Sequence, residues 1–185
     1  MSIQRRSDEL VDLLRPDFVG NDGTASPTFV DEYLTGSHRA SVSVGARVYR
    51  NADFVHNNTA TWLPIDWTHQ RWDDPDDNQW AVAPNPTRLT CQIDGIYVIT
   101  AAGVWDVNAT GQRMMGIVLN GGNFLAIDAR ITLNATYNPR NVVTTTWKMV
   151  ATDFVEIHVY QNSGGNLNLL TAGDHSPEFS MVRVA

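Results

Sequence analysis

Residues 89–99 run Leu89-Thr90-Cys91-Gln92-Ile93-Asp94-Gly95-Ile96-Tyr97-Val98-Ile99. Apolar side chains recur at every second position before and after Asp94-Gly95, which is the period of two β-strands joined by a turn. Short runs of the same kind continue to residue 185. We therefore expect an antiparallel β-sandwich that binds and assembles rather than one that transforms a substrate.

The alternating pattern begins at Gly45 and predicts an all-β domain over residues 45–185, in the form of an antiparallel ten-stranded jelly-roll sandwich. Gly121-Gly122 and Ser163-Gly164-Gly165 are expected turns, because glycine adopts positive φ without a Cβ clash. Two segments, Ile96–Trp105 and Arg113–Leu119, are apolar on both faces. Either they are central strands or another copy covers their outer face. The ten predicted strands are Ala46–Asn51, Thr61–Ile65, Thr87–Ile93, Ile96–Trp105, Arg113–Leu119, Asn123–Thr132, Asn141–Val150, Phe154–Gln161, Leu167–Leu170 and Glu178–Val184.

Residues 1–44 differ from the rest and predict a short, mostly helical arm. Ser7 can cap a first helix that ends before Pro16, and Ser26-Pro27 is a strong start signal for a second helix that ends at Gly36. Two helices this short need a partner surface. We expect an anchor to other proteins, made by Leu10, Leu13, Leu14, Phe29 and Tyr33.

The chain has 185 residues, enough for one domain with a full core, and a formal net charge of −7. Lys148 is the only lysine, so no basic patch for nucleic acid or anionic lipid is expected. No apolar run is long enough to cross a bilayer, and residues 1–12 lack the apolar core of a signal peptide. Cys91 is the only cysteine and is expected to be a buried apolar group. These features predict synthesis in a cytosol, with no membrane insertion.

The segment Gly95-Ile96-Tyr97-Val98-Ile99 resembles the Gly-x-Tyr-x-Phe strand of the globular head of complement component 1q. Gly45–Tyr49 resembles the opening strand of that family, and Glu178–Val184 resembles its last strand. The resemblance covers residues 45–185 and implies the jelly roll shared with tumour necrosis factors, which assembles as a homotrimer. Ile99 departs from the pattern, because the family usually has an aromatic residue there, and the chain has no collagen-like stalk.

Three further segments resemble small minor tail proteins of bacteriophages that carry this kind of head: Thr110–Arg113, Leu119–Gly121 and Ser176–Phe179. This resemblance implies a virion protein that is made in the host cytoplasm and released by lysis. The missing signal peptide fits that interpretation, since a secreted cytokine-like protein would need one.

Residues 62–80 hold four of the six tryptophans, together with a run of carboxylates and amides. Exposed indoles can stack on sugar rings while polar side chains bond the hydroxyls, so a saccharide site is one interpretation. The other is that these rings fill the sandwich core and the subunit interface. If a sugar binds here, the expected ligand-binding residues are Trp72, Trp80, Asp76 and Asn78.

Four carboxylates surround Pro75 and could supply oxygen ligands to calcium. They lack EF-hand spacing, and a solvated acidic loop is the alternative. The residues are Asp73, Asp74, Asp76 and Asp77. No other cofactor is expected.

Catalytic motifs are missing from the sequence. It contains no Gly-x-Ser-x-Gly nucleophile elbow, and its five histidines are scattered without metal-ligand spacing. We expect no enzymatic activity; the alternative is glycoside hydrolysis by a pair of carboxylates.

These patterns together predict a homotrimeric jelly-roll knob on a phage tail or tail tip, bound to the virion through residues 1–44 and to host cell-wall glycan through its head. The alternatives are a capsid decoration protein, a stand-alone carbohydrate-binding module and, last, a glycan-degrading enzyme. We expect the trimer interface to include Tyr97, Trp105, Ile117 and His158.

Overall fold

The computed structural model describes residues 44–57, 60–73, 78–132, 136–171 and 177–185. All regular secondary structure in these ranges is β-strand, and none of their residues forms a helix of the length and apolar character needed to span a membrane. The predicted N-terminal helices and the anchor residues Leu10, Leu13, Leu14, Phe29 and Tyr33 lie outside the described residues.

The described residues form twelve strands, two more than predicted. They are β1 (Gly45–Tyr49), β2 (Phe54–His56), β3 (Leu63–Pro64), β4 (His69–Asp73), β5 (Arg88–Thr90), β6 (Gly95–Val104), β7 (Gln112–Leu119), β8 (Asn123–Ile131), β9 (Arg140–Met149), β10 (Phe154–Gln161), β11 (Leu167–Leu169) and β12 (Glu178–Arg183).

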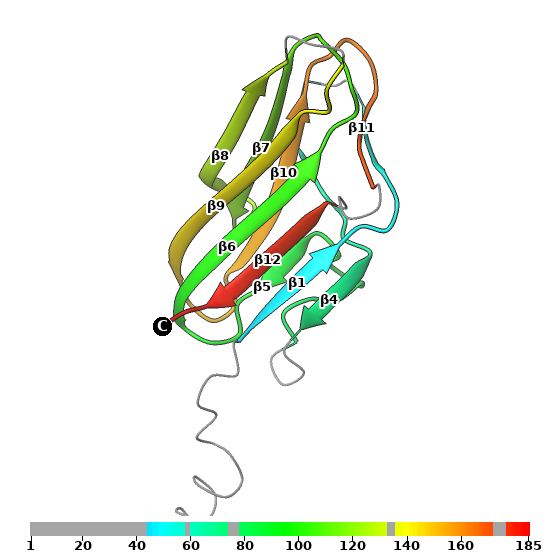
Figure 1. Cartoon of the computed structure of the whole chain (residues 1–185). Helices are drawn as coiled ribbons and strands as arrows, with labels where there is room; N and C mark the ends of the chain where they lie inside the picture. The colour runs from blue at the N-terminus through cyan, green and yellow to red at the C-terminus, as the bar shows by residue number, and fades with distance from the viewer. Residues whose placement is uncertain (1–43, 58–59, 74–77, 133–135, 172–176) are drawn as a thin grey trace, which may run out of the picture. The chain divides into compact units, whose positions relative to one another are not determined.

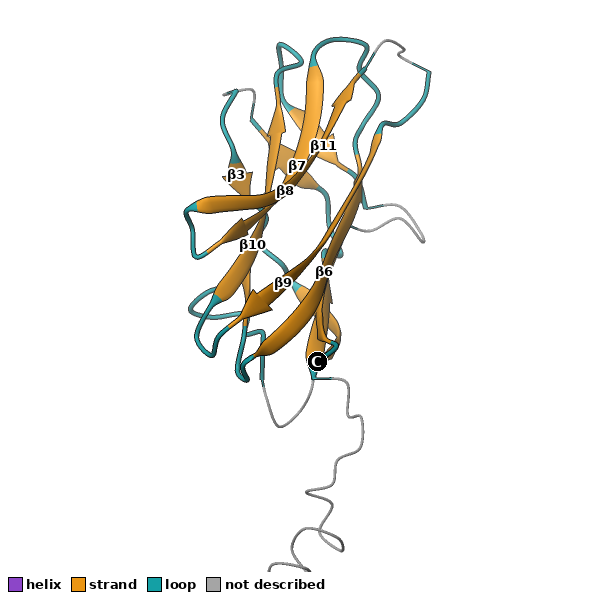
Figure 2. Cartoon of the chain, turned by 90° about the vertical axis from the view of Figure 1, so that its left-hand side faces the viewer, coloured by secondary structure: helices purple, strands orange, loops and turns teal. Residues whose placement is uncertain are grey.

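The strands build a sandwich of two main sheets (Figures 1 and 2). The first sheet has the order β4-β1-β12-β6-β9, and the second has the order β3-β10-β7-β8, with β5 also paired to β10. A small third sheet joins β11 to β2. Every pairing is antiparallel, and most neighbours are far apart in sequence. The all-β antiparallel sandwich is therefore as expected.

The core lies between the facing sides of the two main sheets. Tyr97, Ile99 and Ala101 of β6 alternate inward from one side, and Ile157 and Val159 of β10 alternate inward from the other. Removing each large apolar side chain from water contributes about 1.5–3 kcal/mol. Burial of these alternating apolar side chains is therefore the main contribution that holds the two sheets together.

The two segments that are apolar on both faces prove to be central strands. β6 lies between β12 and β9, and β7 lies between β10 and β8. On β7, Gly116 makes room for the ring of Phe124, since a Cβ added there would come within 2.6 Å of that ring. Its central position accounts for the apolar character of both faces of β7, but the outer face of β6 is not covered by any described segment.

The two strands that were not predicted are β2 and β4. β2 is three residues long, and β4 (His-Gln-Arg-Trp-Asp) has no apolar alternation because it is an edge strand exposed along most of its length. The predicted turn glycines are confirmed, with φ of 67° at Gly121 and 91° at Gly164. Cys91 is fully buried and free, and burial raises the pKa of its thiol.

Candidate functional site

The outer face of the first sheet has small and apolar side chains along its middle. On β6, Ile96, Val98, Thr100 and Ala102 alternate with core residues and point outward. No described segment crosses this face (Figure 1), and Ile96 is 40% exposed. Neighbouring strands continue the same surface with Val142, Thr144, Ser180 and Val182.

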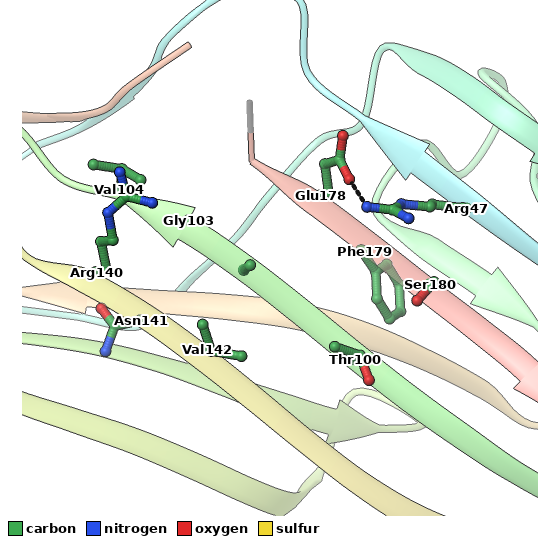
Figure 3. Close-up of a pocket in the computed structure, with 11 residues that line it drawn as sticks. Arg47, Thr100, Gly103, Val104, Arg140, Asn141, Val142, Glu178, Phe179 and Ser180 are labelled. Carbon is green, nitrogen blue, oxygen red and sulfur yellow. Dashed lines mark hydrogen bonds and ion pairs between the residues drawn. The ribbon is translucent and has the colours of Figure 1, made fainter. Parts of the chain in front are cut away.

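A hollow of about 390 Å³ lies in this face (Figure 3). The register places Ser180 beside Thr100, so short side chains line one part of the hollow, and it places Glu178 beside Ala102. Val142 stands next to Ala102 on the other side and is 58% exposed. An uncovered sheet face with exposed apolar side chains such as Ile96 and Val142 is suited to contact with another protein surface.

Three charged residues line the hollow: Arg47, Glu178 and Arg140. Arg47 forms an ion pair with Glu178 (Figure 3), and the Nη2 of Arg71 lies 2.7 Å from the other carboxylate oxygen of Glu178. The guanidinium of Arg71 also covers the ring of Tyr49 at 4.1 Å. Burial by itself would raise the pKa of Glu178, but the hydrogen bonds from Arg71 and Arg47 outweigh it and lower that pKa. The carboxylate of Glu178 is therefore held in its ionised form between two arginines at neutral pH.

The side of the sandwich where β8 and β9 run is a second apolar surface. These are the edge strands of the two sheets, and Asp128 joins them by accepting hydrogen bonds from the Asn141 side chain at 2.8 Å and from the Val142 amide at 3.3 Å. Ile127 of β8 is 49% exposed, beside Gly116 on the outer side of the second sheet, and Trp147 of β9 is 42% exposed. Trp147 stands opposite Tyr97 in the core-facing register, and it is exposed because β9 has no further neighbour in its sheet.

The predicted interface residues Tyr97, Trp105 and Ile117 are corrected by the structure, because their side chains are fully buried within one chain. The Tyr97 hydroxyl donates to the Ile93 carbonyl at 2.7 Å, and the Trp105 indole donates to Asn141 at 2.8 Å. Alternation showed that these strands were apolar, but it did not show which face was the core. His158 is half-buried on the second sheet, 3.4 Å from Glu156, and so lies away from the open face of the first sheet.

The tryptophans of residues 62–80 divide between packing and exposure. Trp67 packs on Phe179 in the core with ring centroids 5.6 Å apart, and Trp62 lies 4.6 Å from the ring of Phe124. Trp80 was predicted to stack on a sugar, and this is wrong: it is 6% exposed, and its indole donates to the Pro86 carbonyl at 3.2 Å. Trp72 is 36% exposed on β4, beside Arg47.

The acidic segment is described only at its two ends. The carboxylate oxygens of Asp73 accept hydrogen bonds from the backbone amides of Gln79 and Trp80, both at 3.1 Å, and thereby close the loop between them. Asn78 is exposed, with φ of 46°. Asp74, Asp76 and Asp77 lie outside the described residues, and within the described ranges no three His, Cys, Asp or Glu residues gather as metal ligands would. Calcium binding stays a prediction.

The sequence prediction overlooked three features: the position of Ala102 on the open face, the exposure of Val142 and Trp147, and the burial of Gln79. The two-residue period gave a usable signal for the first, since Thr100 and Ala102 alternate with core residues. The other two depend on which strands form the sheet edges and on how the loop after β4 folds back.

The fold can be matched to solved structures. The Eiger tumour necrosis factor of S. frugiperda is similar over 77% of this chain and 93% of its own, with a TM-score of 0.55 and 14% identity. The globular domain of zebrafish complement 1qA protein is similar over 76% of this chain and 97% of its own, with a TM-score of 0.51 and 14% identity. Murine APRIL is similar over 76% of this chain and 98% of its own, with a TM-score of 0.53 and 10% identity. No protein-family model matches the sequence, and no curated protein does.

These similarities confirm the jelly roll of the tumour necrosis factor and complement 1q type. At identities of 10–14% they show the fold alone.

Proposed function

We propose that the chain is a non-enzymatic, homotrimeric jelly-roll head that serves as a structural and attachment protein of a phage tail or tail tip. The observation that carries the trimer is the open face of the first sheet, where Ile96, Ala102 and Val142 have no cover among the described residues. Antiparallel sheets usually present polar side chains on a solvated face. This face is instead suited to contact with another protein surface.

The second copy supplies the cover through its β8–β9 edge. Ile127 and Trp147 of that edge offer exposed apolar area, and the hollow beside Thr100 and Ala102 offers space to receive it. The open face of one copy then meets the β8–β9 edge of the next. Because two different surfaces are in contact, the copies must close into a ring to give a finite assembly. Three copies close it in our proposal. A stable contact of this kind buries about 800 Å² on each partner.

Virion attachment and host binding complete the proposal. Residues 1–44 join the head to other virion proteins, and the three heads present identical surfaces to host cell-wall glycan, so that weak contacts add up through avidity. The segments Thr110–Arg113, Leu119–Gly121 and Ser176–Phe179, which resemble phage minor tail proteins, support the virion role.

Light scattering tests the trimer on the full chain. The expected mass is three times the 20.5 kDa of one chain. Val142→Asp places a carboxylate in the proposed contact, where it would be buried without a partner, and should yield a monomer. Val55→Asp is the matched control, because Val55 is 53% exposed on β2 in the separate two-stranded sheet. A monomeric wild-type chain would end the trimer proposal.

The virion role has its own test. Removal of residues 1–36 should leave the trimer intact but abolish incorporation into phage particles. Particles that still incorporate the shortened chain would contradict the anchoring role of the arm.

A further inference from the structure

A second hollow, of about 250 Å³, lies where β8 ends and β9 begins (Figure 1). Two arginines line it, and no carboxylate does so among the described residues. The formal net charge of the whole chain is −7, so a hollow with two cations and no acid is a local exception. The lining residues that matter here are Arg130, Ile131, Tyr137 and Arg140.

The guanidinium of Arg130 is held in place through one of its edges. Its Nε lies 3.0 Å from Asp128, whose carboxylate also accepts hydrogen bonds from the Asn141 side chain at 2.8 Å and from the Val142 amide at 3.3 Å. The two terminal nitrogens of Arg130 form no hydrogen bond with any described residue, and the side chain is 57% exposed. Their N–H donors therefore remain available to a ligand, in a fixed plane.

Arg140 is a cation without a counter-ion. It is exposed and forms no ion pair, hydrogen bond or ring contact with any described residue. Arg140 also lines the hollow of the open face, where β6 lies between it and Glu178 (Figure 3). The backbone on both sides is fixed on Trp105, whose amide donates to the Pro139 carbonyl at 2.8 Å and whose indole donates to Asn141 at 2.8 Å. The charge of Arg140 is thus presented from a rigid base.

The rest of the lining adds apolar surface beside the two guanidiniums. Tyr137 is 73% exposed and Ile131 is 70% exposed. A tyrosine ring offers an apolar body and a hydroxyl group, which suits a ligand that has both carbon and oxygen atoms. Two guanidiniums are too few for a nucleic-acid surface, but their planar forks match the paired oxygens of one phosphate or carboxylate.

We propose that this hollow binds the anionic group of a charged sugar, a phosphate or a carboxylate, with Arg130 and Arg140 donating to its oxygens and the Tyr137 ring packing on the sugar. The inference rests on the proposed attachment role and assigns its ligand site. It differs from the site expected around Trp72, because β4 and β9 are opposite edges of the first sheet. One chain makes the whole site, so a trimer carries three copies and gains avidity.

Calorimetry or ligand-observed NMR on the full chain tests the site with three probes that share one sugar ring: methyl glucoside, methyl glucuronide and methyl glucoside 6-phosphate. At least one charged probe should bind, and more tightly than the neutral one. Binding of only one of the two identifies the anion as carboxylate or phosphate. Raising the salt concentration from about 0.1 M to about 1 M should weaken this binding, because the Debye length falls from about 10 Å to about 3 Å.

Substitutions locate the binding. Arg140→Gln should weaken it on the order of tenfold, through loss of a charge-assisted hydrogen-bonded pair. Arg140→Lys keeps the charge but loses the planar fork, and should restore only part of the affinity. Neither should move the midpoint of urea unfolding, since Arg140 has no partner among the described residues. Lys148→Gln removes an exposed cation near the other end of β9 and is the matched control, which should bind like wild type.

Four outcomes would overturn the assignment. They are equal losses of binding in Lys148→Gln and Arg140→Gln, binding of methyl glucoside as tight as that of the charged probes, failure of both charged probes, and binding that is lost in Trp72→Ala but kept in Arg140→Gln. Light scattering on the same samples reports the trimer separately, so that either proposal can fail alone.

Discussion

The sandwich buries a glutamine at each end of β10, and the two differ in their surroundings. Gln161, at the last residue of β10, donates to the carbonyls of His56 and Gly165 and accepts from the Ser163 amide at 2.7 Å. Gln79 lies near the first residue of β10, and its side-chain amide has no hydrogen-bond partner among the described residues. Both are essentially inaccessible to water.

The side-chain amide of Gln161 stabilises the fold through its hydrogen bonds, whereas the side-chain amide of Gln79 forms none that would do so. At the Gln161 end the hydrogen bonds secure the turn 162–166 and the entry to β11. At the Gln79 end the backbone bonds secure the loop, and the side chain contributes nothing to stability. Gln79 is therefore expected to lower the stability of the fold where Gln161 raises it, because an unpaired buried amide loses its hydrogen bonds to water without replacing them.

The largest expected effect is at Gln161. Gln161→Leu keeps the side-chain volume but removes three buried hydrogen bonds, to the carbonyls of His56 and Gly165 and from the Ser163 amide, and we expect a loss of about 3 kcal/mol in the free energy of unfolding. Urea denaturation measures it. Gln92→Leu, at an exposed glutamine, is the control and should stay within about 0.5 kcal/mol of wild type. A loss of less than about 0.5 kcal/mol in Gln161→Leu would show that the hydrogen bonds of Gln161 do not stabilise the fold.

Asn141 tests whether other buried amides at the same end behave like Gln161. Its oxygen accepts from the Trp105 indole at 2.8 Å, and its nitrogen donates to Asp128 at 2.8 Å. Asn141→Leu leaves the buried indole unpaired, so we expect a loss of about 2 kcal/mol by urea denaturation. Asn123→Leu, at an exposed residue of β8, provides the comparison. Equal stability of these two variants would contradict the structural role of Asn141.

Gln79→Leu should have a smaller effect of opposite sign. Because no hydrogen bond is lost and an unpaired amide is removed from the interior, we expect a gain of about 1 kcal/mol in the free energy of unfolding. The measurement is the same denaturation series as for Gln161→Leu. A loss comparable to that of Gln161→Leu would show that the two glutamines contribute alike to the stability of the fold.

The smallest expected effect concerns Glu156, which faces Arg88 across the β5–β10 pairing. A hydrogen bond from His158 lowers the pKa of Glu156 most; burial acts in the opposite direction, and the hydroxyl of Thr87 adds a further bond at 2.5 Å. A lowered carboxylate pKa contributes stability that is fully present above the ordinary glutamate value of about 4.3. That contribution is lost as the pH falls through the lowered value.

Urea denaturation between pH 7 and pH 3 measures this contribution. The wild-type chain should lose stability at the acid end, and Glu156→Gln should lose less over the same interval. An identical acid dependence in the two proteins would show that Glu156 does not contribute.

The sequence by itself determined the fold class and most of the strand positions. The spacing of Tyr97, Ile99 and Ala101 gives the strand period, and Gly121 and Gly164 mark turns that need positive φ. Both are properties of neighbouring residues, so they are visible in a linear sequence. The same is true of Cys91, whose apolar neighbours at every second position predicted its burial.

The tertiary structure alone decided which surfaces are available to partners. Period two places Tyr97 and Val98 on opposite faces but does not say which face meets the second sheet, and for this reason the interface prediction chose buried residues. Likewise, Trp72 is exposed and Trp80 is buried only because β4 is an edge strand and the following loop folds back onto β5. Those outcomes depend on pairings between residues far apart in the chain, such as Thr90 with Gln79 and Arg47 with Trp72, which no local pattern records.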